Sequence, residues 1–149
     1  MNLEGTREFD APRETVWQVL NDPHRLAALV PLIDDVEVRD LDHWRAAVRI
    51  PLGFRDVHMH VDFLRSDVRE PEHAKLAGTG GARGARLHFA TEFHLEPNGN
   101  GTIMRWRADV GIGGPLGGLG SRALHPLAQH HVGRLLDGLE RQVEDARAA

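Results

Sequence analysis

Hydrophobic and polar positions alternate at the start of the chain, which predicts a half-buried β-strand over residues 3–9. Pro12 then suits the first position of a helix capped by Asp10 or Ala11, because apolar residues recur behind it at helical spacing. A second short helix is predicted from His24 to Val30, since a proline follows it. The chain is therefore expected to begin with a strand and two short helices.

The stretch from about residue 36 to residue 111 has the pattern of β-strands. Its first two strands alternate apolar and charged residues, which predicts a hairpin with one dry face. Pairing apolar with apolar residues places Val48 opposite Val57, and the same register places Arg49 opposite Asp56. The hydrophobic and charge patterns therefore favour the same register.

A second hairpin is predicted around the turn Pro97–Asn100, whose residue types favour turns. In the register that hydrophobicity favours, Phe93 faces Met104. That register also brings Glu92 opposite Arg105, so opposite charges again agree with the apolar pairing. With the weaker strand between these hairpins, about six antiparallel strands follow the two short helices.

The last segment has apolar residues at every third or fourth position, which predicts a long amphipathic helix that extends to about Ala146. Pro126 either marks the first turn of this helix or kinks a longer helix that begins near Pro115. Only this helix is long enough to cover the apolar face of the sheet. The predicted fold class is α+β, with a curved antiparallel sheet of about seven strands wrapped on a long C-terminal helix.

The composition excludes several classes of function and site. The 149 residues predict a single domain, residues 1–149, and the lack of cysteine excludes disulfides, thiolate nucleophiles and cysteine-ligated metal sites. The 18 basic and 22 acidic residues are spread along the chain, so nucleic acid is not an expected partner. Since there is neither a secretory signal nor an apolar run of about 18 residues, we expect a cytoplasmic protein.

The ten histidines raise the question of a metal site. His58 and His60 would point the same way from one strand, but arginines are expected opposite them, so a solvated polar face is favoured. His130 and His131 lack the His-Glu-x-x-His pattern of zinc proteases. We therefore predict no metal ligands and no cofactor. An inward-facing His131 would more often be a satisfied core residue than a catalytic base.

Two further features have open interpretations. The glycine-rich run at residues 111–121 lacks the lysine of a phosphate-binding loop, and is interpreted as a bend that can gate a cavity. Neither Ser66 nor Ser121 lies in a nucleophile elbow, so no catalytic residue is predicted. Arg7 falls on the apolar face of its strand and needs an anion there, either an internal carboxylate or a ligand group, unless it reaches solvent at the sheet edge.

The opening Gly5–Trp17, together with Leu20–Pro23 and the later Leu119–Arg122, resembles the G-subunit family of carbon monoxide dehydrogenase. That family belongs to the START-like (SRPBCC) superfamily, which includes polyketide cyclases and lipid-transfer proteins. The Ala-Pro-x-x-x-Val-Trp motif at residues 11–17 is typical of the superfamily, whereas the glycine-rich entry into the last helix favours the G-subunit family. The resemblance spans nearly the whole chain.

This resemblance implies a helix-grip fold that surrounds an apolar tunnel, and binding of lipids, quinones, sterols or polyketides. It also implies a partner complex, since G-subunit proteins are associated with recruiting a molybdenum hydroxylase to the membrane or supplying it with quinone. Some relatives carry a long C-terminal membrane-anchoring extension, whereas this sequence stops soon after Glu144–Arg147, so we expect at most transient membrane contact.

The expected function is non-catalytic binding and carriage of a hydrophobic small molecule, with an isoprenoid quinone as the favoured ligand. A cavity lined by methionines and aromatic residues would suit such a ligand. The residues expected to contact it are Arg7, Leu29, Val48, Met59, Phe63, Phe89, Phe93, Met104, Trp106, Leu127, His131 and Leu135, with Gly114, Gly117, Gly118 and Gly120 at the mouth.

Two alternatives stay open. One is an enzyme of the polyketide cyclase or aromatase kind, in which His131 acts as the base and Arg7 as the electrophilic anchor. The other is an assembly or docking factor with a filled core and an exposed apolar patch.

Overall fold

The computed structural model describes residues 1–30, 32–51, 56–82, 84–114 and 117–148, without the side chains of residues 117–125, 127–129 and 131. The chain begins with a strand and two short helices, continues with six strands and ends with a long helix, which confirms the predicted order. The elements are β1 (Asn2–Phe9), α1 (Arg13–Leu20), α2 (Pro23–Leu29), β2 (Ile33–Val38), β3 (His43–Pro51), β4 (Asp56–Arg69), β5 (His73–Ala82), β6 (Ala85–Asn98), β7 (Gly101–Gly113) and α3 (Gly117–Ala148).

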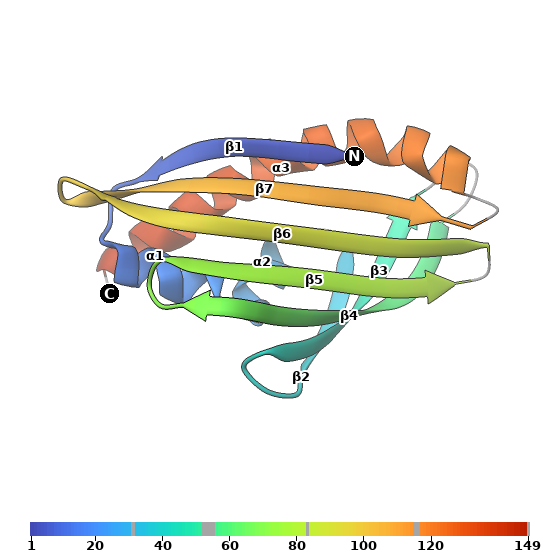
Figure 1. Ribbon diagram of the computed structural model, residues 1–149, viewed down its shortest axis with the longest axis horizontal. Helices are drawn as coiled ribbons and strands as arrows, with labels where there is room; N and C mark the ends of the chain where they lie inside the picture. Colours follow the sequence, from blue (N-terminus) through green and yellow to red (C-terminus); the bar gives the residue numbers. More distant parts are fainter. Residues whose placement is uncertain (31, 52–55, 83, 115–116, 149) are drawn as a thin grey trace.

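The strands form one antiparallel sheet with the order β1-β7-β6-β5-β4-β3-β2. The strands from β2 to β7 are neighbours in sequence order, whereas β1 pairs with β7 at the edge. Figure 1 shows α3 along one face of the sheet, with its C-terminal end beside α1. We call this face the inner face and the opposite one the outer face. The arrangement confirms the predicted α+β fold class.

The short helices begin slightly differently from the prediction. Pro12 is the N-cap of α1 and not its first residue, and its carbonyl accepts hydrogen bonds from the backbone N–H groups of Thr15 and Val16. Asp22 caps α2 through its carboxylate, which accepts from the backbone N–H groups of His24 and Arg25. Asp22 thereby satisfies N–H groups that have no partner within the helix.

The first hairpin differs from its predicted register by two residues. Val48 faces Met59 where Val57 was expected. A shift of two leaves every side chain on its predicted face, because side chains alternate with a period of two. The expected contact between Arg49 and Asp56 survives as a diagonal ion pair of 3.5 Å.

The second hairpin shows the same shift. Phe93 faces Trp106 where Met104 was expected, and Glu92 faces Arg107 where Arg105 was expected. The charge pattern could not distinguish the two registers. Arg105 and Arg107 lie two residues apart on β7, so Glu92 on β6 faces an arginine in either register.

The described part of the long helix runs from Gly117 to Ala148 with Pro126 inside it, so the interpretation of a longer helix that begins near Pro115 is the correct one. Gly114 precedes this helix with φ of +89°, a conformation that glycine adopts without a Cβ penalty. No helix in the described ranges is long and apolar enough to cross a membrane.

The buried hydrophobic residues that the structure describes form two clusters. The α1 cluster joins α1, the C-terminal half of α3 and the neighbouring ends of β1 and β5–β7. The β3–β4 cluster joins β3 and β4 to the opposite ends of β6 and β7. The α1 cluster contains Phe9, Ala11, Val16, Trp17, Val19, Ala74, Leu95, Met104, Leu139 and Val143. The β3–β4 cluster contains Ala46, Val48, Ile50, Val57, Met59, Val61, Ala85 and Ile112.

Candidate functional site

A set of aromatic side chains occupies the inner face between the two clusters. Phe63 packs against the β3–β4 cluster, whereas Phe93 and Trp106 pack against the α1 cluster. Phe89 belongs to neither cluster and contacts Phe63 edge-on, with ring centroids 6.3 Å apart. All four side chains are only partly buried. We call these four residues the central aromatic set.

Small residues on β5 make room for this set. A Cβ atom added to Gly78 would lie 2.9 Å from Cε1 of Phe63, so the ring rests directly on the glycine backbone. A Cβ atom added to Gly80 would lie 2.7 Å from the carbonyl oxygen of His60. The glycines of β5 therefore let side chains from β4 lean over the inner face of this strand.

Trp106 contributes the one polar atom of the central aromatic set. Its ring lies against Gly5, where an added Cβ atom would be 3.1 Å from Cζ2. The indole nitrogen Nε1 is buried and has no hydrogen-bond partner among the residues that the structure describes. A buried donor without a partner costs about 1–3 kcal/mol, so an acceptor brought by a ligand would relieve this cost.

Arg7 finds its anion within the protein. Its Nη1 lies 3.1 Å from Oδ1 of Asp137 and 3.3 Å from Oε2 of Glu140. Both carboxylates belong to α3, so these ion pairs connect β1 to the long helix. Of the interpretations left open by the sequence, the internal carboxylate partner is the one observed. The pairing also occupies the group that the cyclase alternative needed as its electrophilic anchor.

The other residues predicted to contact the ligand differ in how deeply they are buried. Val48, Met59 and Met104 are buried inside the two clusters. Leu29 and Leu135 pack against the α1 cluster and are partly buried. The side chains of Leu127 and His131 lie outside the described part of the structure.

The glycines predicted at the mouth of the cavity lie in two different parts of the chain. Gly114 lies at the end of β7, and a Cβ atom added to it would be 3.2 Å from the carbonyl oxygen of Gly84. Gly117, Gly118 and Gly120 belong to the first turns of α3, so they extend the helix and do not form a loop. From Gly117 onward the glycine-rich run is therefore helical.

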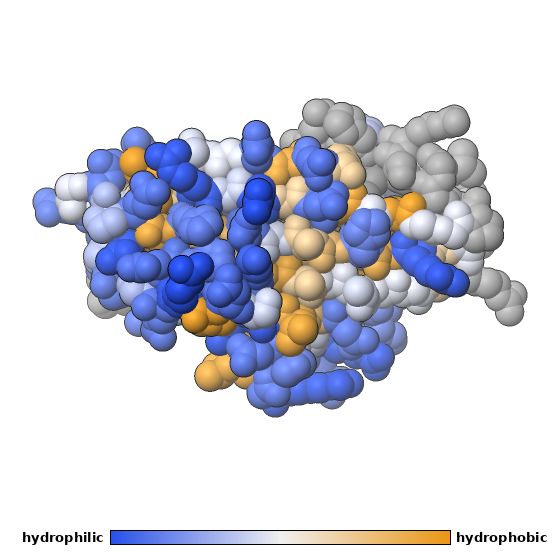
Figure 2. Space-filling model, in the orientation of Figure 1, coloured by the Kyte–Doolittle hydropathy of each residue, from blue (hydrophilic) through white to orange (hydrophobic). Residues whose placement is uncertain are grey.

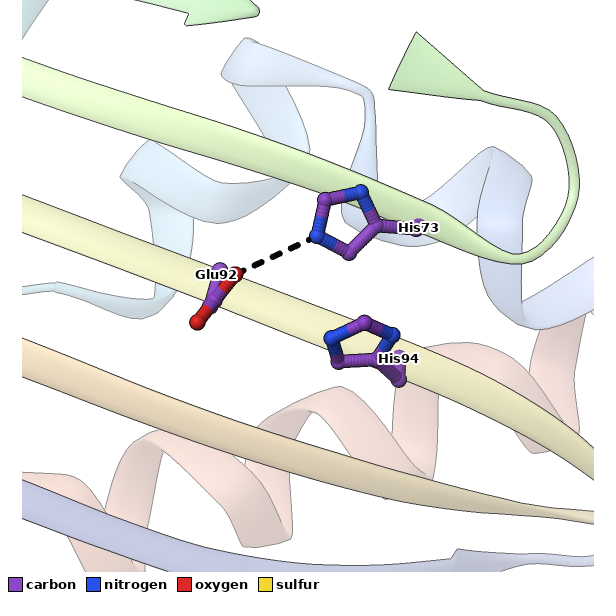
Figure 3. Close-up of side chains that lie close together, drawn as sticks. All are labelled: His73, Glu92 and His94. Carbon is purple, nitrogen blue, oxygen red and sulfur yellow. Dashed lines mark hydrogen bonds and ion pairs between the residues drawn. The ribbon is translucent and has the colours of Figure 1, made fainter. Parts of the chain in front are cut away.

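A second group of functional side chains lies on the outer face and was not predicted from the sequence. The donor atoms of His73, Glu92 and His94 all lie within 4.8 Å of one another (Figure 3). A hydrogen bond from His73 holds the pKa of Glu92 below its usual value, with nearby Arg107 acting in the same direction and burial opposing both. His94 and Glu92 stand at i and i+2 on one strand, which was the signal available in the sequence.

Comparisons with known proteins support the fold and identify the family. Residues 5–144 match the family of the carbon monoxide dehydrogenase G subunit, CoxG, whereas no curated protein matches the chain. A conserved protein from Geobacillus kaustophilus is 20% identical over 98% of this chain and 97% of its own, with a TM-score of 0.83. A START superfamily protein from Mycobacterium smegmatis is 18% identical over 97% of both chains, with a TM-score of 0.70. The family match covers nearly the whole sequence, so this chain belongs to the CoxG family.

Proposed function

We propose that this protein binds and carries a hydrophobic small molecule on the inner face of its sheet, with an isoprenoid quinone as the favoured ligand. The family and the START-like fold indicate a small-molecule-binding protein. The observation that carries the finer proposal is the central aromatic set, which stays partly exposed between the two clusters that the described buried residues form. An apolar ligand placed there would remove that surface from water, and such burial is favourable by about 25 cal/mol per Å².

Trp106 gives the proposed site a polar anchor. A quinone has an apolar ring and carbonyl oxygens that accept hydrogen bonds, whereas a plain hydrocarbon offers no acceptor. The buried Nε1 of Trp106 is a donor without a partner among the described residues. Pairing it with a quinone carbonyl adds a hydrogen bond worth about 0.5–1.5 kcal/mol and removes the penalty of the orphaned donor. This arrangement favours a quinone over an alkane of similar size.

A blocking substitution tests the site. Ala108 lies on the inner face of β7, two residues from Trp106, and Ala108→Phe would place a ring among the central aromatic set. Binding of a short-chain ubiquinone analogue is measured by quenching of tryptophan fluorescence. We expect the wild type to bind the analogue and this variant to bind it at least about 10-fold more weakly, a loss of about 1.4 kcal/mol in binding free energy. Native mass spectrometry of the untreated protein should show a co-purifying apolar molecule.

Ala90→Phe is the matched control, because Ala90 is exposed on the outer face of β6 and receives the same ring. It should bind the analogue as the wild type does. A protein that purifies without any apolar molecule and gives no quenching with either a ubiquinone or a menaquinone analogue contradicts the carrier proposal. Equal binding by the Ala108→Phe and Ala90→Phe variants places the ligand elsewhere and contradicts the assigned site.

The proposed partner is a molybdenum hydroxylase of the carbon monoxide dehydrogenase type, and the name of the family supports this choice. An isoprenoid quinone is poorly soluble in water. A protein that carries the quinone would present it to the enzyme, which would then reduce it. With purified enzyme and quinone, the rate of quinone reduction should rise when the wild-type protein is added and should rise less with the Ala108→Phe variant. An unchanged rate contradicts this partner while leaving the binding proposal intact.

A further inference from the structure

The pairing of β5 with β6 brings three potential metal ligands together on the outer face. His73 on β5 pairs with His94 on β6, and Glu92 occupies the next outward position of β6. Figure 3 shows their side chains on the side of the sheet turned away from the helices. The rings of His73 and His94 lie with their centroids 4.3 Å apart. The group is separate from the proposed ligand site, which lies on the inner face.

The orientation of His73 is fixed by its surroundings. The ring is 3% exposed, and Nδ1 donates a hydrogen bond of 3.0 Å to the backbone carbonyl of Asp67. Asp67 has φ of +47° within the irregular pairing between Ser66 and Arg69, a left-handed conformation that aspartate tolerates better than most residues. Donation from Nδ1 to a carbonyl is the usual support of a metal-bound histidine, and it directs Nε2 toward the cluster.

The contact between His73 and Glu92 requires a cation. Nε2 of His73 lies 3.2 Å from Oε2 of Glu92. With Nδ1 as the donor, a neutral imidazole presents a lone pair from Nε2 toward a carboxylate oxygen, and two lone pairs repel each other. Either a proton on Nε2 or a metal ion between the two atoms resolves this repulsion.

The spacing suits a metal ion. Ligand atoms bound at about 2.0–2.1 Å around a tetrahedral zinc ion lie about 3.3 Å apart, close to the observed separation of Nε2 and Oε2. His94 is exposed on the same face, so its ring can rotate toward the other two donors from within the observed limit of 4.8 Å. Only side-chain rotation is needed to complete the ligand set.

Neighbouring charges hold Glu92 in place without occupying the atom that faces His73. Arg107 forms an ion pair with Oε1 of Glu92, which leaves Oε2 for the metal. An ion pair to the other oxygen orients a carboxylate that binds a metal. The other nearby guanidinium, that of Arg105, is paired with Glu96 at 3.3 Å. Both arginines are thus partly neutralised, although they still reduce the affinity for a cation.

The cluster opens into a groove. Glu92 and His94 line a hollow of about 610 Å³ on the outer face, together with the outward-facing Glu4, Thr6, Arg105 and Arg107. Figure 2 shows that this face is mostly hydrophilic. Water can therefore reach a metal ion held by the three side chains. Two histidines and one glutamate with an accessible fourth position form the donor set of many zinc sites.

We propose that His73, Glu92 and His94 bind a divalent transition-metal ion, with Zn²⁺ as the ion that best fits their donor atoms, and with a water molecule from the groove as a fourth ligand.

The test uses full-length protein without a polyhistidine tag, first dialysed against a chelator. Isothermal titration with Zn²⁺ near neutral pH should give one equivalent of bound metal, and Co²⁺ should give the visible absorption of a low-coordinate site. His94→Ala removes an exposed ligand and should weaken Zn²⁺ binding by at least about 10-fold. Glu92→Gln should do the same, and circular dichroism checks that both variants fold.

His58 and His60 provide the matched control, because they stand at i and i+2 on the exposed face of β4. The double variant His58→Ala/His60→Ala should retain the wild-type affinity for Zn²⁺. The proposal is overturned by a wild type that takes up no Zn²⁺, which would leave a proton as the shared cation. It is also overturned by His94→Ala and Glu92→Gln variants that keep the wild-type affinity. Both outcomes are independent of quinone binding, which is measured on the inner face.

Discussion

At the residue scale, glycines on β5 determine how closely the neighbouring strand can pack against it. Gly80 allows Val61 of the neighbouring strand to lean across β5, since an added Cβ atom would lie 2.9 Å from Cγ2 of Val61 and 2.7 Å from the carbonyl oxygen of His60. The backbone contact cannot be relieved by rotating a side chain. Glycine at this position is therefore required by the packing, although glycine generally weakens a strand.

We expect Gly80→Ala to lower the free energy of unfolding by about 1–3 kcal/mol, the usual cost of overpacking. Urea denaturation followed by circular dichroism measures the change. Gly81→Ala is the matched control, because the nearest atom to its added Cβ is 3.9 Å away and the position is exposed. That control should change stability by no more than about 1 kcal/mol, in the stabilising direction if at all. Equal losses in both variants would contradict the packing explanation.

The outer-face cluster could not be recognised from any single strand. His73 and His94 are 21 positions apart in the numbering, and only the pairing of β5 with β6 makes them neighbours. Histidine pairs within one strand, such as His58 and His60, are visible in the sequence itself. A ligand set shared by two strands depends on the register, which the hydrophobic pattern leaves undetermined to within steps of two residues.

At the element scale, the sequence predicted strands and faces well because burial imposes a period of two. It could not choose between registers that differ by two residues, since both place the same side chains inside. The observed register pairs Arg45 with Asp62 at 3.0 Å, an ion pair as plausible in advance as the expected one between Arg49 and Asp56. The start of α1 also differed from expectation, because Pro12 is the N-cap of this helix and not its first residue.

The start of α2 gives a direct test of a capping interaction. Asp22→Ala removes the acceptor for the backbone N–H groups of His24 and Arg25, so we expect a loss of about 0.5–2 kcal/mol in the free energy of unfolding. Asp22→Asn keeps a side-chain oxygen and should recover most of that loss. The measurement is urea denaturation of the two variants beside the wild type. An Asn variant as unstable as the Ala variant would show that the charge of Asp22, and not its role as a cap, stabilises this end of the helix.

At the scale of the whole molecule, the sequence predicted a sheet closed by one long helix, and the structure confirms it. The sequence could not show that the described core residues fall into two clusters, because alternation identifies which residues face inward but not how completely each is covered. Met59 and Phe89 look alike in the pattern, yet Met59 is buried within a cluster whereas Phe89 belongs to neither. The candidate ligand site depends on that difference in three-dimensional packing.

The grouping of the described core residues into two clusters predicts that these clusters contribute independently to stability. Val143→Ala in the α1 cluster and Val57→Ala in the β3–β4 cluster should each cost about 2 kcal/mol, from lost burial and the cavity left behind. In ligand-free protein the double variant should lose the sum to within about 0.5 kcal/mol, because the sites share no contact. Denaturation of the four proteins measures this. A larger deviation from additivity would show that the clusters are coupled through the inner face.

The pairing of β1 with β7 has a consequence for biosynthesis. The partner of the first strand emerges from the ribosome about a hundred residues later, since Phe9 pairs with Thr102 and Asn2 pairs with Asp109. Until then the backbone N–H and C=O groups of β1 have no neighbouring strand to pair with. Contacts this distant along the chain slow folding because a large loop must close first. The edge of the sheet is thus completed only after β7 has been synthesised, and a chaperone that shields β1 until then would increase the yield of native protein.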